Sequence, residues 1–140
     1  MIKSPAKKES LQSLIKEADA WFSKYIRILY ADSSGMVTCS CGCGKRLFWT
    51  QIQASHFISR ANMATRYELH NVVPATRECN YYDPDHVEKI GIFISNKFGL
   101  QAARNLLSSH SIMKFTRQEI VEIIDTYKKK FQELKKQKGL

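Results

Sequence analysis

Three polar side chains in the middle of the sequence have types and spacing that could hydrolyse a phosphodiester bond. His56 is followed by Asn71 fifteen residues later and by Asn80 nine residues after that. Such hydrolysis needs a base that activates water, a cation that neutralises charge on the phosphate, and a scaffold that holds both in register. A histidine and an oxygen-donor residue could supply the first two. The spacing alone also fits an ordinary histidine with two asparagines in turns or caps.

The cysteines form a second group with chemical potential. Cys39, Cys41 and Cys43 alternate with Ser40 and a glycine, and Cys79 follows well downstream. In a reducing cytosol such clustered thiols are more often metal ligands than disulfides. The alternative is three free thiols in a loop and a fourth that is simply buried, with packing alone holding the loop.

The patterns around these residues predict an α+β fold. Apolar residues at spacings of three and four predict amphipathic helices over 11–31 and 116–136, the second opened by a capping-box sequence. Between them, residues 36–83 carry β-prone segments and then a short helical run, with a β-hairpin element expected over 45–58. Further helices are expected in 84–108. The two terminal helices could pack on this core or pair between two protomers, so a homodimer is one expectation.

Composition adds a class of partner and a location. The chain has 22 Lys and Arg against 13 Asp and Glu, for a net charge of +9, which favours polyanions such as nucleic acid. No apolar run approaches the ~20 residues that span a bilayer, and no apolar stretch follows the lysines of the N-terminal MIKSPAKKES, unlike a signal peptide. We therefore expect one domain over 1–140, in the cytoplasm, with no membrane contact.

Several segments together resemble a known family. The chain resembles the NinG/Rap-like phage recombination nucleases of the HNH superfamily, and the resemblance extends over most of its length. The segments that carry it are FSKYIRILYAD (22–32), VTCSCGCGKRLFW (37–49), QASHFISR (53–60), TRYELHNVVP (65–74), RECN (77–80) and FTRQEIVEIIDTYKKK (115–130).

The resemblance implies a fold and a reaction. It implies a ββα-metal core with a zinc-knuckle-like loop, in a DNA endonuclease of phage recombination or DNA processing that acts in the cytoplasm of a bacterial host. His56 would be the general base, Asn71 would tether the loop that orients it, and Asn80 would bind catalytic Mg²⁺ or Mn²⁺ through its carbonyl oxygen. Branched DNA such as a Holliday junction is the substrate that the family suggests.

Two departures from the family pattern affect the metals. Such nucleases typically carry two Cys-x-x-Cys knuckles around a structural zinc, but here Thr76 stands where a cysteine is expected. The four thiols present could still build a tetrahedral zinc site, given flexible glycines in the first knuckle. The residue before the base, often Asp or His, is Ser55. Asp83 and His86 could supply the missing ligand, although a helix cap and an early-helix residue are their ordinary roles. The full set of zinc ligands would be Cys39, Cys41, Cys43 and Cys79.

Nucleic-acid contacts are expected from the arginines beside these motifs, with solvated surface charge as the rival interpretation. The three arginines are Arg60, Arg66 and Arg77, joined by lysines of the last helix. Phosphate contacts of this kind position DNA without reading its sequence. A second hypothesis is a zinc-containing DNA-binding module that has lost catalysis, suggested by Ser55 and the altered knuckle. An RNA-binding module is a third, but no aromatic platform motif supports it.

Overall fold

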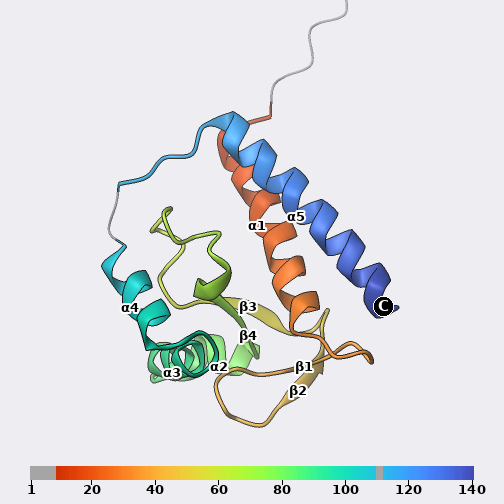
Figure 1. Ribbon diagram of the computed structural model, residues 1–140, viewed down its shortest axis with the longest axis vertical. Coiled ribbons are helices and arrows are strands. Elements are labelled where there is room, and N and C mark those ends of the chain that lie inside the picture. Colours follow the sequence, from red (N-terminus) through yellow and green to blue (C-terminus); the bar gives the residue numbers. More distant parts are fainter. Residues whose placement is uncertain (1–8, 110–111) are drawn as a thin grey trace, which may run out of the picture.

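Two long helices lie side by side along one edge of the molecule. The computed structural model describes residues 9–109 and 112–140. The helices α1 (Leu11–Leu29) and α5 (Arg117–Lys138) are neighbours, and the strands and shorter helices lie on the other side of α1 (Figure 1). The two C-terminal ends meet, since the carbonyl groups of Ile28 and Leu29 at the end of α1 accept hydrogen bonds from Lys138 at the end of α5. The helices therefore run in the same direction.

Both helices begin at a side-chain cap and bury one apolar stripe. Ser10 accepts a hydrogen bond from the Ser13 N–H, and Thr116 forms a capping box with Glu119. Burying one large apolar side chain stabilises a fold by about 1.5–3 kcal/mol, so the shared stripe fixes the pair. The expected amphipathic helices are confirmed, with α1 ending two residues earlier and α5 two residues later than predicted. The buried residues are Leu14, Ala18, Phe22, Ile26, Ile28, Ile120, Ile124 and Phe131.

The strands form two separate antiparallel pairs. Strand β1 (Met36–Thr38) pairs with β2 (Arg46–Phe48), and the cysteine-rich loop joins them. Strand β3 (Gln53–His56) pairs with β4 (Val72–Ala75), which places His56 opposite Val72. The hairpin predicted over 45–58 is therefore wrong. Its two halves belong to different pairs because the turn between them is drawn into the core.

That turn contributes two buried side chains to the core beneath α5. Trp49 and Ile52 pack with Phe131, and the Trp49 and Phe131 ring centroids are 5.6 Å apart. Side chains three residues apart point to opposite faces of a strand, so a continuous strand could not bury both Trp49 and Ile52 in this core. Strand β2 therefore ends before Trp49, and β3 begins after Ile52.

Three shorter helices complete the fold. Helix α2 (Arg77–Tyr82) follows β4 directly, so the order β3, β4, α2 agrees with the predicted strand, strand, helix. Helices α3 (His86–Phe98) and α4 (Leu100–Ser108) then cover β4, as expected for 84–108. A second core cluster joins them to the sheet: Val73, Ile90, Ile94, Ala103 and Leu106.

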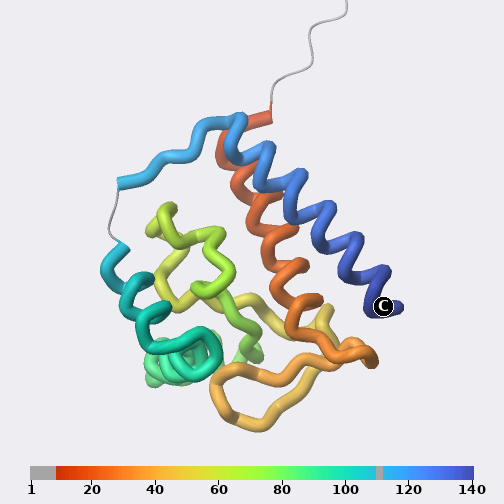
Figure 2. Tube along the Cα trace, viewed as in Figure 1, coloured from red at the N-terminus to blue at the C-terminus, as the bar shows by residue number. Residues whose placement is uncertain are grey.

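The connection between β3 and β4 folds back between α4 and α1 (Figure 2). It is pinned at both sides, because Asn62 donates a hydrogen bond to the Ser109 carbonyl and Tyr67 packs edge-on against Phe22. Among the described residues, no helix combines the length and apolar character that a membrane span requires.

Candidate functional site

His56 ends β3 with one ring nitrogen already engaged. Its Nε2 lies 3.0 Å from the backbone carbonyl oxygen of Arg66. A carbonyl oxygen only accepts, so Nε2 carries the proton and Nδ1 keeps a free lone pair in the neutral ring. Burial lowers the pKa of His56, and the nearby Arg60 charge adds to this effect although the Arg66 carbonyl opposes it. The ring is therefore neutral and able to accept a proton near neutral pH.

Asn71 is fully buried and closes the loop that carries the Arg66 carbonyl. Its Oδ1 accepts a hydrogen bond from the Ile58 N–H at 2.7 Å, and its Nδ2 donates to the carbonyl oxygens of Ile58 and Thr65 at 3.1 and 3.0 Å. Thr65 directly precedes Arg66. The Asn71 amide thus fixes the backbone on which the orientation of the His56 ring depends.

Asn80 lies on α2 and turns its side chain toward β3. Its Oδ1 accepts a hydrogen bond from Ser55 Oγ at 2.8 Å, and its Nδ2 donates to Gln53 Oε1 at 2.9 Å. Helix α2 is positioned by Thr76, whose side chain caps it by accepting from the Cys79 N–H. Thr76, where the resemblance led us to expect a cysteine, therefore has a structural role at the start of this helix.

His56 and Asn80 open into the same cleft. The cleft has a volume of about 530 Å³ and lies between the polar face of α1 and the sheet edge formed by β3. Asn71 lies outside it. Sequence reasoning missed the contribution of α1, although polar residues spaced by four opposite the apolar stripe are a readable signal. The α1 residues in the cleft are Asp19, Phe22, Ser23 and Arg27, and the others are Ile52, Gln53, Ala54, Ser55, His56, Arg60, Asn80 and Tyr81.

The structure brings three of the four cysteines together. The sulfur atoms of Cys39, Cys43 and Cys79 all lie within 4.8 Å of one another. The backbone N–H of Thr76 also donates to Cys39 Sγ at 3.3 Å. Cys41 is not in this group of three. Cys41 packs beside the group, in a buried cluster with Cys39 and Cys79. Burial, and after it the neighbouring Cys39 and Cys79 thiols, raise the pKa of the Cys41 thiol.

His86 connects the cysteines to the cleft. The side chain is buried, with Nδ1 3.1 Å from Cys41 Sγ and Nε2 2.7 Å from Ser55 Oγ. Ser55 in turn contacts Asn80, so a continuous polar chain runs from Cys41 to Asn80. Burial lowers the pKa of His86. Asp83, the other residue considered as a cation ligand, instead binds Lys89 and accepts from the Asp85 N–H.

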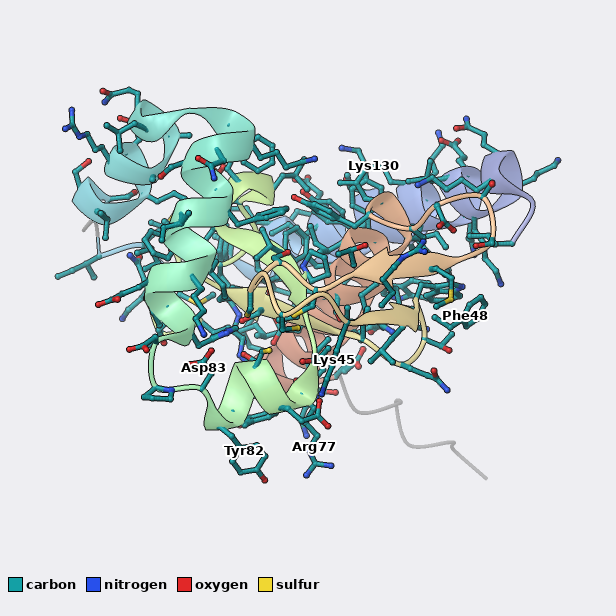
Figure 3. The ribbon with its side chains drawn as sticks, turned by 90° about the horizontal axis from the view of Figure 1, so that it is seen from below. Lys45, Phe48, Arg77, Tyr82, Asp83 and Lys130 are labelled. Atoms are coloured by element: carbon teal, nitrogen blue, oxygen red, sulfur yellow. The ribbon has the colours of Figure 1, made fainter. Side chains whose placement is uncertain are left out.

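The three arginines expected at DNA occupy different settings. Arg66 forms a bidentate ion pair with Asp19: its Nε donates to Oδ1 at 2.9 Å and its Nη2 donates to Oδ2 at 2.5 Å. The Arg66 guanidinium is therefore already paired within the fold. Arg60 is exposed and lines the cleft, 3.9 Å from the same carboxylate. Arg77 begins α2 and projects away from the body of the molecule, as does Tyr82 at the other end of α2 (Figure 3).

Comparison with known proteins identifies a family. The family model described as Bacteriophage Lambda NinG protein matches residues 2–137, almost the entire chain. No curated protein matches the chain, and no solved structure does.

Proposed function

The chain belongs to the bacteriophage lambda NinG protein family, and from that premise we propose that it is a metal-dependent endonuclease that hydrolyses phosphodiester bonds of DNA. The single observation that carries the proposal is the setting of His56. Its ring is neutral, its Nε2 is held on the Arg66 carbonyl, and it lies in a cleft shared with Asn80. Strands β3 and β4 with α2 would form the ββα-metal core. Phage recombination or DNA processing is the role proposed for it.

In the reaction, His56 Nδ1 would accept a proton from the attacking water. The ring would then carry a positive charge while Nε2 keeps its hydrogen bond to the Arg66 carbonyl, which favours the charged form. Asn71 would hold that carbonyl still through its contact with Thr65. A fixed base of this kind typically contributes a factor of about 10²–10⁴ to the rate.

We assign the catalytic Mg²⁺ or Mn²⁺ to the end of the polar chain at Asn80 Oδ1 and His86 Nε2. Both atoms already lie against Ser55 Oγ, at 2.8 and 2.7 Å. A cation held by these two side chains would take the place of the contacts that both atoms now make to Ser55 Oγ, next to the cleft that Asn80 lines. The bound cation would neutralise charge on the phosphate and the leaving oxygen. Asp83 is not included because its carboxylate is paired with Lys89.

We assign a structural zinc to Cys39, Cys43 and Cys79, with Cys41 as the fourth ligand. Tetrahedral zinc with 2.3 Å bonds places its sulfur atoms about 3.8 Å apart, which the observed group accommodates. Such an ion would connect the β1–β2 loop to α2 one residue before Asn80. His86 Nδ1 could then donate to the Cys41 thiolate, which leaves Nε2 as the free ligand atom.

A zinc-containing DNA-binding module without catalysis is the second candidate. It is favoured by the absence of a carboxylate from the polar chain of Cys41, His86, Ser55 and Asn80 in the described part of the protein. Mg²⁺ is usually held by one or two carboxylates as well as by substrate phosphates. Measured cleavage separates the two candidates.

The test is cleavage of plasmid DNA and of a synthetic four-way junction with Mg²⁺ or Mn²⁺. His56→Ala should reduce the rate by a factor of about 10²–10⁴. The matched control is His70→Ala, since His70 stacks on Phe98 outside the cleft and its loss should leave the rate unchanged. Equal cutting by His56→Ala and the unaltered protein, or no cutting by either, would overturn the nuclease proposal. The junction also tests branched-DNA preference, and the size of the complex on it tests for two protomers.

A further inference from the structure

The polar face of α1 borders the cleft but has no part in the proposed chemistry. Asp19, Ser23 and Arg27 are spaced by four and form one stripe opposite the apolar stripe that packs on α5. Lys16 lies one turn before Asp19 and is exposed. The stripe therefore offers a line of side chains along the cleft wall.

Arg27 is a positive charge held in place without a carboxylate partner. Its Nε donates to the backbone and side-chain oxygens of Ser23 at 3.2 Å each, and its Nη1 donates to the Trp49 carbonyl at 3.1 Å. Burial lowers the pKa of Arg27. None of the ion pairs formed by the described residues includes it. The guanidinium has five N–H groups, so donors remain for an anion in the cleft.

The cleft continues along α1 into a second hollow. This hollow has a volume of about 780 Å³ and shares Asp19 and Arg60 with the cleft. Lys16 lines it. The Asp19 carboxylate is paired with Arg66, and Arg60 lies 3.9 Å from the same carboxylate, so the groove keeps an excess of positive charge from Arg27, Arg60 and Lys16.

We propose that one DNA strand follows the polar face of α1, with its phosphates bound by Arg27 at one end of this groove and by Lys16 at the other. Lys16 precedes Arg27 by eleven residues, which is about 16 Å along the helix at 1.5 Å per residue. That length corresponds to roughly five 3.4 Å steps of a DNA strand. His56 lines the cleft together with Arg27 and with Asp19 and Arg60, the two residues that the cleft shares with the second hollow.

This inference rests on the proposed function for its substrate, but it can be tested without cleavage. Binding of a fluorescent 16-base-pair duplex is measured by anisotropy at several salt concentrations, with no added divalent ion, in a His56→Ala background. Arg27→Gln and Lys16→Gln should each weaken binding about three- to tenfold and reduce the slope of log K against log salt by about one. Arg27→Lys should weaken binding less than Arg27→Gln, because lysine keeps the positive charge but lacks the planar guanidinium that can bind a phosphate through two N–H groups.

The matched control is Arg104→Gln, which removes one exposed positive charge on α4, outside the groove. It should leave the salt slope unchanged. Lys16 is exposed, and none of the ion pairs in the described part of the chain includes it, so Lys16→Gln keeps the test valid if Arg27→Gln fails to fold. A salt slope unaltered by Lys16→Gln, or altered equally by Arg104→Gln, would overturn the groove. Absence of cleavage together with these binding losses would overturn only the nuclease proposal.

Discussion

The two halves of the site are held in contrasting ways. On the base side, named for the proposed role of His56, Asn71 binds the Thr65 carbonyl and Asp19 binds the Arg66 guanidinium. Both contacts hold the segment whose Arg66 carbonyl meets the His56 ring. On the metal side, named for the proposed zinc, the sulfur atoms of three cysteines lie close together, and His86 and Ser55 connect a fourth to Asn80. The comparison teaches that His56 is oriented by hydrogen bonds already made within the fold, whereas Cys79 of α2 belongs to a group of thiols that would help to position the helix if the proposed zinc binds.

The largest expected effect comes from the metal side. If zinc binds there, Cys79→Ser should lower the free energy of unfolding by about 4 kcal/mol, the stabilisation given by a ligand at 1,000 times its Kd. Elemental analysis of protein purified without chelator should find about one zinc per chain in the unaltered protein and less in the variant. Stably folded protein without metal would contradict the zinc assignment. Ser40→Ala in the same loop is the control and should keep its zinc.

Breaking the base side should cost slightly less. Asn71→Ala leaves the Ile58 N–H and the Thr65 carbonyl buried without their partner. We expect a loss of about 3 kcal/mol in urea denaturation, because each unsatisfied buried group costs about 1–3 kcal/mol. Zinc content should not change, which separates the two halves. An unaltered midpoint would show that the loop is held by other contacts. Ser59→Ala, which removes one exposed hydrogen bond of the same loop, gives the scale for a small effect.

The choice of cation ligand can be sharpened by a pair of variants. His86→Ala should raise the Mg²⁺ concentration for half-maximal cleavage about tenfold, since metal ligands and their orienting partners commonly contribute 10–100-fold. Asp83→Asn should leave that concentration unchanged, because Asp83 is engaged with Lys89. The reverse result would move the cation from His86 to Asp83.

The smallest expected effect concerns the pH profile. Because burial lowers the pKa of His56, kcat/KM should stay constant above pH 6.5 and decline tenfold per unit only once the pH falls through a value below 6.5. The unfolded chain binds the proton more readily, so this histidine also makes the fold less stable as pH falls below about 6.5. Arg60→Gln removes a charge that helps lower the pKa, so its kcat/KM profile should shift slightly toward higher pH. A shift in the opposite direction would exclude His56 as the titrating base.

The sequence by itself determined the elements whose patterns are local. The stripes of α1 and α5, the capping box at Thr116 and the order of strand, strand and helix before Asp83 could all be predicted, because caps and helical periodicity involve residues three or four apart. The residue types and spacing of His56, Asn71 and Asn80 indicated phosphodiester chemistry, and the family resemblance implied their individual roles, which are proposals.

Only the tertiary structure decided which distant residues meet. The pairing of β3 with β4 joins strands on either side of a long connection, and the interpretation of 45–58 as one hairpin failed because the burial of Trp49 and Ile52 separates its halves. The same holds for Arg66 on Asp19 and for His86 between Cys41 and Ser55. Such contacts depend on the packing of whole elements, and no periodicity along the chain encodes them.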